Sequence, residues 1–377
     1  MKSTIYAQLG VRPLINCATT YTRLGGSIML PQVAQAMADA SQCFVNIFEL
    51  QVALGERLAT LTNNQAAYVS NGAAAALALT TAGCMTGDDP ALMARLPLDT
   101  GGMRNEVVVH RVQRNWYDAA IRQVGATIVE IGHSLETQEW ELDAAITDRT
   151  AAVFYFAGAH LSRNTLPLEF VVEKAHERGV AVVVDGAAQV PPVENLWLFT
   201  RDTGADAAIF SGGKGLRGPQ NSGLVVGSER LIRATRLNGP PYQRIGRSMK
   251  MSKEAMVGLL AAVEAFLETN FESQALVFSE VVDRWMSTWS SVADAPVKVH
   301  RLETNEAGEP IPRTIVSLLP ESRTSRDELV GILRSGDPSI EVVLNDARSI
   351  AFSPHLLQEG EATQVERRVS AVLKEFR

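Results

Sequence analysis

The sequence predicts an α/β protein: a large domain with a seven-stranded, mostly parallel sheet, and a smaller αβ domain toward the C-terminal end. Two observations support this fold class. The chain has 377 residues, more than one hydrophobic core usually reaches, so two lobes are expected. Between residues 66 and 227, short apolar runs rich in β-branched residues alternate with stretches of helical character.

Seven runs are predicted as strands because they are short and in several cases almost continuously apolar. Such runs are typical of parallel strands, whose two faces are both covered. The predicted strands cover residues 66–70, 106–110, 126–131, 151–156, 180–184, 207–211 and 223–227. Between two of them, residues 168–179 show helical periodicity and end at Gly179, a typical helix stop.

Three segments are predicted along the chain. Residues 1–50 are expected to form an arm with a helix over 31–43, packed against one lobe or a partner subunit. Residues 51–252 form the large domain, and residues 253–377 contain a linking helical stretch (253–289) and the small domain. The small domain's predicted strands are 297–303, 313–319, 340–345 and 349–353, and its predicted helices are 325–335 and 361–376.

Composition and charge disfavour several classes of protein. The net charge of −7 argues against a protein that mainly binds nucleic acid, and the apolar runs are too short and too broken to span a membrane. The chain has three cysteines, Cys17, Cys43 and Cys84, and none of them has CxxC spacing. We therefore expect no disulfide framework and a location in the reducing cytoplasm. The six histidines show no HxxxH spacing, and no metal is expected.

Asp185 stands where an almost continuously apolar strand, VAVVV, ends. In an open α/β sheet, the carboxyl ends of the parallel strands form the edge where ligands bind. A carboxylate at this edge serves as a helix cap, as a structural hydrogen-bond acceptor or as a functional anion. The residue alone does not distinguish these roles.

Lys214 lies in a glycine-rich turn, SGGKGLRGP, at the end of the next predicted strand. One interpretation is a lysine solvated at a loop tip, the usual fate of this residue. The other is an amine nucleophile that forms an imine with a carbonyl cofactor. In the second case, the glycines at positions 212, 213, 215 and 218 would let the backbone approach a bulky ring.

A third group of residues follows the first predicted strand. The segment YVSNGAAAALAL runs from that strand through Ser70, Asn71 and Gly72 into an alanine-rich helix that begins near Ala73. A helix N-terminus offers free N–H groups and the positive end of its dipole to an anion. This turn is therefore a candidate phosphate site.

Taken in chain order, these residues resemble the signature of the class-V branch of fold-type-I enzymes, which use pyridoxal 5'-phosphate (PLP). The resemblance rests on Asp185, Ala187 and Gln189 (DxAxQ), Asp206, Ser211 to Lys214 (SxxK), Gly218-Pro219 and Gly223. It implies that Lys214 forms the Schiff base with the cofactor and moves protons at the substrate α-carbon. It also implies that Asp185 pairs with the protonated pyridine nitrogen.

Further cofactor contacts follow from the same resemblance. Ala187 is expected on the ring face, Gln189 at the phenolic oxygen, and Ser211 at the phosphate together with Ser70, Asn71, Gly72 and Ala73. The string FSGGKGLRGPQ most resembles the selenocysteine-synthase-like group, in particular its D-glucosaminate-6-phosphate ammonia-lyase members. The likeness covers roughly residues 8–270.

Three positions depart from relatives in this branch. Gly213 precedes the lysine where the desulfurases carry a histidine, and no cysteine follows residue 84. Gln113 stands where the ammonia-lyase relatives are expected to carry a ring-stacking histidine. Gln113, Trp116 and Tyr117 are therefore the candidates to approach the ring.

Four arginines and one tyrosine are the predicted substrate contacts. Arg114 and Tyr117 follow a strand, where a substrate contact and a helix start are equally expected. Arg217, Arg247 and Arg348 are candidates to bind a carboxylate or phosphate, against the alternative that they are solvated.

The resemblance implies a PLP-dependent lyase. The expected reaction is α,β-elimination of a small β-hydroxy or sugar-derived amino acid, phosphorylated or not, to a 2-keto acid and ammonia. Racemisation or transamination is the alternative, because a stabilised α-carbanion permits each. Selenium transfer on seryl-tRNA is disfavoured by the acidic charge, and a PLP-sensing regulator because residues 1–50 are too short for a DNA-binding domain. We expect a homodimer or higher homo-oligomer in the cytoplasm.

Overall fold

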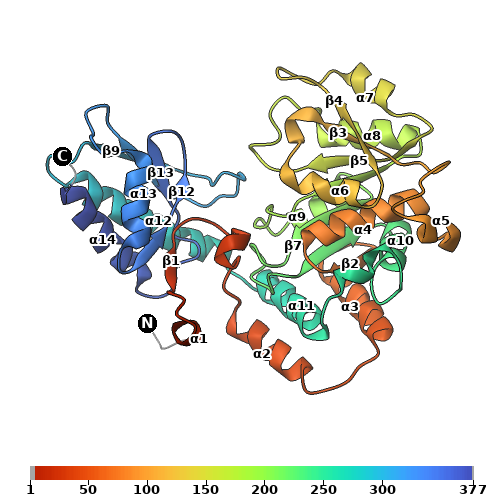
Figure 1. Cartoon of the computed structure of the whole chain (residues 1–377), viewed down its shortest axis with the longest axis horizontal. Helices are drawn as coiled ribbons and strands as arrows, with labels where there is room; N and C mark the ends of the chain where they lie inside the picture. Colours follow the sequence, from red (N-terminus) through yellow and green to blue (C-terminus); the bar gives the residue numbers. More distant parts are fainter. Residues whose placement is uncertain (1–4, 376–377) are drawn as a thin grey trace. The chain divides into compact units, whose positions relative to one another are not determined.

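A computed structural model describes residues 5–375, so the ends of the predicted N-terminal arm (1–4) and C-terminal helix (376) lie outside the described residues. The chain forms two compact units. Residues 27–269 form one, the sheet unit, and residues 270–375 with residues 5–26 form the other, the small unit. Figure 1 labels their elements.

The sheet unit contains a seven-stranded sheet, as predicted. Its strands are β2 (Ala66–Ser70), β3 (Glu106–His110), β4 (Thr127–Ile131), β5 (Thr150–Phe156), β6 (Ala181–Asp185), β7 (Ala207–Ser211) and β8 (Gly223–Gly227). Their bounds lie within one residue of the predicted ones. The strand order is β2-β8-β7-β6-β5-β3-β4, and only β8 runs antiparallel to its neighbours.

This topology decides where the candidate site forms. Because β2 and β7 each pair antiparallel with β8, they run in the same direction as each other and as the four remaining strands. The carboxyl ends of six strands therefore meet at one edge, where Ser70, Asp185 and Ser211 are the last residues of β2, β6 and β7. This edge is called the carboxyl edge below.

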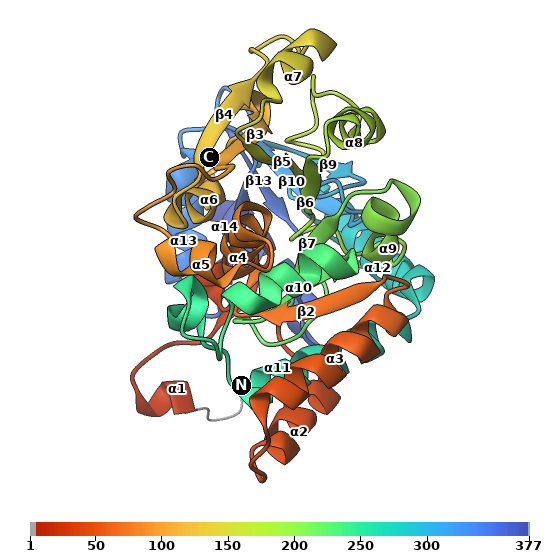
Figure 2. The ribbon, with the colours of Figure 1, turned by 90° about the vertical axis from the view of Figure 1, so that its right-hand side faces the viewer.

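Helices cover both faces of the sheet; Figure 2 shows α4 and α6 on one side of the strands and α8 on the other. The helices of this unit are α2 (Pro31–Ala40), α3 (Ile47–Leu61), α4 (Ala73–Thr86), α5 (Pro90–Arg95), α6 (Ala119–Gln123), α7 (Glu139–Ala145), α8 (Leu168–Glu177), α9 (Asn195–Trp197), α10 (Glu229–Asn238) and α11 (Lys253–Leu267). Helix α4 is alanine-rich and buried along most of its length, which lets α10 pack closely on it at Gly83. The core between helices and sheet includes Phe154, Val183 and Ile209.

The two compact units are bounded differently from the predicted segments. Helices α2 and α11 pack on each other, and α11 also packs on α3, which packs on β2. This packing makes residues 27–50 and 253–269 part of the sheet unit, whereas the predicted large domain covered 51–252. Conversely, residues 5–26 belong to the small unit, because β1 (Leu14–Asn16) pairs parallel with β11 (Ser339–Glu341).

The small unit has a four-stranded antiparallel sheet, ordered β12-β13-β10-β9. Its elements after β1 are α12 (Phe271–Ser290), β9 (Val297–Leu302), β10 (Arg313–Leu318), α13 (Arg326–Ser335), β11, β12 (Val343–Leu344), β13 (Ser349–Phe352) and α14 (Glu361–Glu375). Trp285 and Trp289 stack at 5.2 Å between ring centroids and are fully buried with Phe352. None of the helices within residues 5–375 is long and apolar enough to cross a membrane.

Candidate active site

Asp185 lies at the carboxyl edge and is buried, with 9% of the residue's surface exposed to solvent. Its Oδ1 accepts a hydrogen bond of 2.9 Å from the Ala187 N–H. Burial raises the pKa of this carboxyl, while the Ala187 N–H and the positive charge of Lys214 act in the opposite direction. A buried carboxylate with few partners is stabilised by a cation. The setting therefore suits an acceptor for a protonated ligand nitrogen.

Lys214 follows β7 on a loop that is held from two sides. The Gly213 carbonyl accepts hydrogen bonds from both the backbone N–H and the hydroxyl of Ser27, at 2.9 and 3.0 Å. The Lys214 carbonyl accepts from the Arg217 N–H at 2.9 Å. Ser27 was not predicted as a site residue, because nothing in the sequence links it to a loop almost 190 positions away. The lysine is half-buried rather than solvated at a loop tip.

The glycines around Lys214 let the loop pack closely against the rest of the chain. A Cβ on Gly215 would stand 1.8 Å from the Val190 carbonyl oxygen, and one on Gly212 would stand 1.9 Å from the Ser222 hydroxyl. A Cβ on Gly213 would meet the Gln220 Cα at 2.5 Å. These glycines let the loop pack against protein backbone and side chains, so the close approach is made by the chain itself.

The candidate phosphate turn has the expected local structure. Gly72, with a φ of +85°, is the N-cap residue of α4, and this N-terminus has no side-chain cap hydrogen bond. Ser70 is buried, and its hydroxyl donates to the Gly72 and Gly223 carbonyls. The Asn71 Oδ1 is buried without a hydrogen-bond partner among the described residues. Ala73 is the first residue of α4.

Gly223 joins this turn to the lysine loop. It is the register partner of both Ser70 in β2 and Ser211 in β7. A Cβ here would meet the carbonyl carbon of Gly72 at 2.6 Å and the Ser70 hydroxyl at 2.7 Å. Only a glycine therefore lets the turn lie directly on β8, next to the strand that ends at Ser211.

The end of β7 and the segment after β6 carry the other predicted cofactor contacts: Ala187, Gln189 and Ser211. The Ser211 N–H donates to the Ala187 carbonyl at 3.3 Å, which ties the end of β7 to the segment after Asp185. Gln189 donates from Nε2 to the Ala188 carbonyl at 2.9 Å. Asp206 lies before β7, where its carboxylate accepts from the Val182 N–H and bonds the His176 ring. The structure thus gathers five of the predicted residues at one edge: Asp185, Ala187, Gln189, Ser211 and Lys214.

Residues 111–118 follow β3 at the same edge, and their side chains are mostly engaged. Gln113 is fully buried, and its Oε1 accepts from the Phe156 N–H at 3.1 Å. Arg114 pairs with Asp118 and Glu130. Asn115 accepts from the Tyr117 N–H and donates to the Gln113 carbonyl. Of the three residues predicted to approach the ring, Gln113 packs inward, whereas Trp116 is 95% exposed and Tyr117 is also exposed.

The remaining predicted arginines belong to three different segments. Arg217 has a left-handed backbone (φ +54°), donates to the Ile28 carbonyl at 3.1 Å, and has its pKa lowered by burial. Arg247 is exposed in the 3-10 turn Ile245–Met249. Arg348 belongs to the small unit, where it donates to the Leu318 carbonyl at 3.0 Å.

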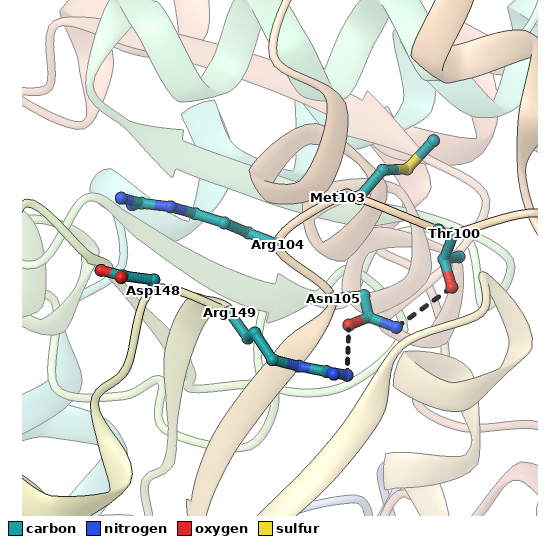
Figure 3. A pocket seen from close by; sticks show the side chains of 8 residues that line it. Thr100, Met103, Arg104, Asn105, Asp148 and Arg149 are labelled. Carbon is teal, nitrogen blue, oxygen red and sulfur yellow. Dashed lines mark hydrogen bonds between the residues drawn. The ribbon is translucent and has the colours of Figure 1, made fainter.

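A pocket of about 350 Å³ lies at the opposite edge of the sheet, lined by residues 100–105 with Asp148 and Arg149. Figure 3 shows the side chains that line it. These residues precede β3 and β5, and none was predicted as part of the site. Asn105 bridges the Thr100 hydroxyl at 3.0 Å and Arg149 at 3.3 Å. Within residues 5–375, no group of His, Cys, Asp and Glu side chains could hold a metal ion.

The carboxyl edge fits PLP group by group. The uncapped N-terminus of α4 suits a phosphate, because its free N–H groups donate hydrogen bonds to an anion. The buried Asp185 carboxylate suits a protonated ring nitrogen. The Lys214 amine is close enough to Asp185 to lower the pKa of its carboxyl. An anion site, a buried carboxylate and an amine on one edge match the three functional groups of PLP.

Comparison with known proteins agrees with this fit. The family model described as aminotransferase class-V matches residues 107–254. The chain is 32% identical to a D-glucosaminate-6-phosphate ammonia lyase of Salmonella typhimurium over 99% of this chain and 98% of that protein. It is 33% identical to a 5'-C-glycyluridine monooxygenase-decarboxylase of a Streptomyces species over 89% of this chain and 83% of that one.

Two further matches bear on the predicted group. An L-seryl-tRNA(Sec) selenium transferase of Shewanella oneidensis is 33% identical over 39% of this chain and 32% of its own. A solved structure of D-glucosaminate-6-phosphate ammonia-lyase superposes with a TM-score of 0.85 and 30% identity, covering 100% of this chain and 99% of that one. The predicted fold, cofactor and relationship are confirmed: the chain belongs to the PLP-dependent class-V aminotransferase family of fold type I, together with D-glucosaminate-6-phosphate ammonia lyase.

Proposed function

We propose that this enzyme is an ammonia lyase that eliminates water and then ammonia from a small β-hydroxy amino acid. The observation that carries the proposal is the grouping of Asp185, Lys214 and the α4 N-terminus at one edge, on a chain whose whole length matches an ammonia lyase. A phosphorylated sugar-derived amino acid is the proposed substrate class, because D-glucosaminate 6-phosphate belongs to it.

Each residue has a proposed part in holding PLP. Lys214 binds it covalently, Asp185 pairs with the ring nitrogen, and Ala187 packs on the ring. Gln189 bonds the phenolic oxygen. Ser211 holds the phosphate together with the turn Ser70, Asn71, Gly72 and Ala73. The support for these parts is their position at the carboxyl edge and the uncapped helix N-terminus.

The proposed chemistry begins at the substrate α-carbon. Bound PLP supplies an electron sink for the pair left when the Cα–H bond breaks. Lys214 Nζ takes the α-proton, and the buried carboxylate of Asp185 holds a proton on the ring nitrogen. The electron pair of the broken Cα–H bond forms a Cα–Cβ double bond, and the β-hydroxyl leaves as water. The released enamine takes up water to give a 2-keto acid and ammonia.

The enzyme is also proposed to act as a homodimer or larger homo-oligomer in the cytoplasm. The N-terminal part of the sheet unit exposes four apolar side chains, Phe44, Val45, Phe48 and Val52. They lie beside a cavity of about 420 Å³ lined largely by apolar residues between α2, α3 and α11. Exposed apolar surface of this kind marks association sites. Mass photometry of the purified enzyme reports the oligomeric state.

The decisive experiment measures products with a substrate panel. The PLP-loaded enzyme is incubated with D-glucosaminate 6-phosphate and with both enantiomers of serine and threonine. Elimination predicts equal amounts of 2-keto acid and ammonia, without added amino acceptor and without oxygen uptake. Inverted substrate without keto acid would instead indicate a racemase, and keto acid only with an amino acceptor would indicate an aminotransferase. Oxygen uptake with carbon dioxide release would point to chemistry like that of the monooxygenase-decarboxylase relative.

A second measurement tests the role of Lys214. Borohydride reduction followed by peptide mass spectrometry is expected to place the reduced cofactor on Lys214. In Lys214→Ala, turnover should fall by about 10²–10⁴-fold, the range for loss of a positioned proton-transfer group. Lys174, which pairs with Glu177 on α8, provides a matched control. An adduct on a different lysine would contradict the assignment.

A further inference from the structure

The loop after β5 brings an unassigned histidine to the carboxyl edge. The Ala157 N–H donates to the Asp185 carbonyl at 2.9 Å, which joins this loop to the end of β6. The Gly158 carbonyl then accepts from the N–H groups of Leu161 and Ser162 and from the Ser162 hydroxyl, at 2.8–2.9 Å. These bonds form a tight turn that carries His160.

His160 and Gln189 both approach Gly158. Seen from the position that a Cβ on Gly158 would occupy, the His160 ring has Cε1 at 3.2 Å and Nδ1 at 3.4 Å, and the Gln189 Nε2 is at 3.5 Å. Gly158 has a φ of +149°, so a side chain would be strained here and would also push the imidazole away. The turn thus holds an exposed imidazole and the Gln189 amide around the same glycine.

The proposed role of Gln189 suggests a chemical role for His160. Under the proposed function, Gln189 bonds the phenolic oxygen of PLP. In the covalent structure of PLP, the carbon bearing that oxygen adjoins the carbon bearing the aldehyde, through which the substrate amine is held. A residue that approaches the same glycine as Gln189 would therefore lie on the side of the ring that bears the phenolic oxygen, next to the carbon that bears the aldehyde. His160 is such a residue.

We propose that His160 is the general acid that protonates the departing β-hydroxyl. The proposal rests on the proposed function, in which Lys214 takes the α-proton. Hydroxide is a poor leaving group, so breaking the Cβ–O bond calls for a second proton-transfer residue. The Cα–H electron pair forms the new Cα–Cβ bond, and the Cβ–O pair goes to oxygen. That oxygen takes the proton of the His160 imidazolium and leaves as water, and solvent restores the proton.

The test compares leaving groups that do and do not need an acid. Chloride leaves without protonation, so β-chloroalanine should bypass His160, whereas serine of the same configuration should not. In His160→Asn, turnover of the hydroxy substrate should fall by about 10²–10⁴-fold, with turnover of β-chloroalanine nearly unchanged. His133→Asn is the matched control, because His133 is an exposed loop histidine of the same unit whose Nδ1 accepts from the Leu135 N–H.

A readout independent of turnover accompanies this comparison. The PLP content and the absorption and circular dichroism spectra of His160→Asn should match those of the wild type, because His160 acts on the leaving group. Exogenous imidazole should restore part of the serine turnover of His160→Gly. Equal losses on both substrates, or equal retention of both activities, would overturn the role of His160. If the wild type eliminates water from no member of the substrate panel, D-glucosaminate 6-phosphate included, the proposed function itself fails.

Discussion

Burial of a carboxylate such as Asp185 destabilises the folded protein unless a cation lies beside it. In the PLP-loaded enzyme, the protonated ring nitrogen would be that cation. Burial raises the pKa of Asp185, and the Ala187 N–H and the Lys214 charge offset this only in part. Replacing Asp185 by Asn keeps an acceptor for the Ala187 N–H and removes the charge. In the PLP-loaded enzyme, the loss of the ring-nitrogen partner should lower kcat by about 10²–10³-fold, as for other preorganised electrostatic groups.

The apoprotein should respond to the same substitution in the opposite direction. Because the folded-state pKa of Asp185 is raised, the folded protein retains this proton to higher pH than the unfolded chain. The contribution of Asp185 to stability is therefore lost as pH rises through the folded pKa. Apo Asp185→Asn should melt above the wild type at pH 8, and this difference should shrink as pH falls below the folded pKa. A thermal melt series checks it, and a difference independent of pH would contradict the argument.

At the scale of single residues, the sequence predicts the chemical role of a side chain better than the direction in which that side chain points. Asp185 and Lys214 were candidates because each follows an apolar strand, and the resemblance to class-V enzymes supplied their expected roles. The inward packing of Gln113 could not be predicted, because it depends on the Phe156 N–H in a strand 43 positions away. His160 was missed for a similar reason: its neighbour Gln189 comes from a different strand end. Such pairings depend on tertiary contacts, which local patterns do not encode.

At the scale of elements, the contact between β8 and the phosphate turn should be the least tolerant of change. A Cβ at position 223 would stand 2.6 Å from the carbonyl carbon of Gly72, and backbone at both sides leaves little room to relax. Gly223→Ala should therefore lower the affinity for PLP and destabilise the protein by about 1–3 kcal/mol, typical of overpacking. Equilibrium dialysis with PLP and urea unfolding measure the two effects.

Gly331 provides the matched control for this substitution. It lies exposed within α13, and a Cβ there would meet nothing within 4 Å. Gly331→Ala should stabilise the protein by up to about 1 kcal/mol, since alanine favours a helix interior, with no change in PLP affinity. If Gly223→Ala binds PLP as tightly as Gly331→Ala, the turn on β8 is not the phosphate site.

The elements also show where pattern reading reaches its limit. Every strand of the large sheet was predicted within one residue, because continuous apolar runs distinguish buried parallel strands. Residues 340–345 were predicted as one strand, yet β11 pairs with β1 while β12 pairs with β13. Strand β1 has only three residues and was not predicted. Its partner lies more than 300 positions away, so only the folded chain reveals the pairing.

At the scale of the whole molecule, the described site groups for PLP fall within the sheet unit, whereas the small unit has a separate core around Trp285, Trp289 and Phe352. A ligand that binds the folded form stabilises it by about 2.7 kcal/mol at one hundred times its dissociation constant. PLP should therefore slow hydrogen exchange in β6 and β7 strongly, and in β10 and β13 only weakly. Hydrogen-exchange mass spectrometry with and without PLP measures the four strands together.

The comparison also needs a control for cooperativity between the units. Lys214→Ala, with added PLP, should lose most of the protection in β6 and β7, because the covalent bond is absent, while β10 and β13 keep their wild-type exchange. Since local and subglobal openings differ in free energy between cooperative units, unequal protection is expected where two cores unfold separately. Equal slowing of exchange in all four strands would show that the two cores open as one, and the division into two compact units would then carry no energetic meaning.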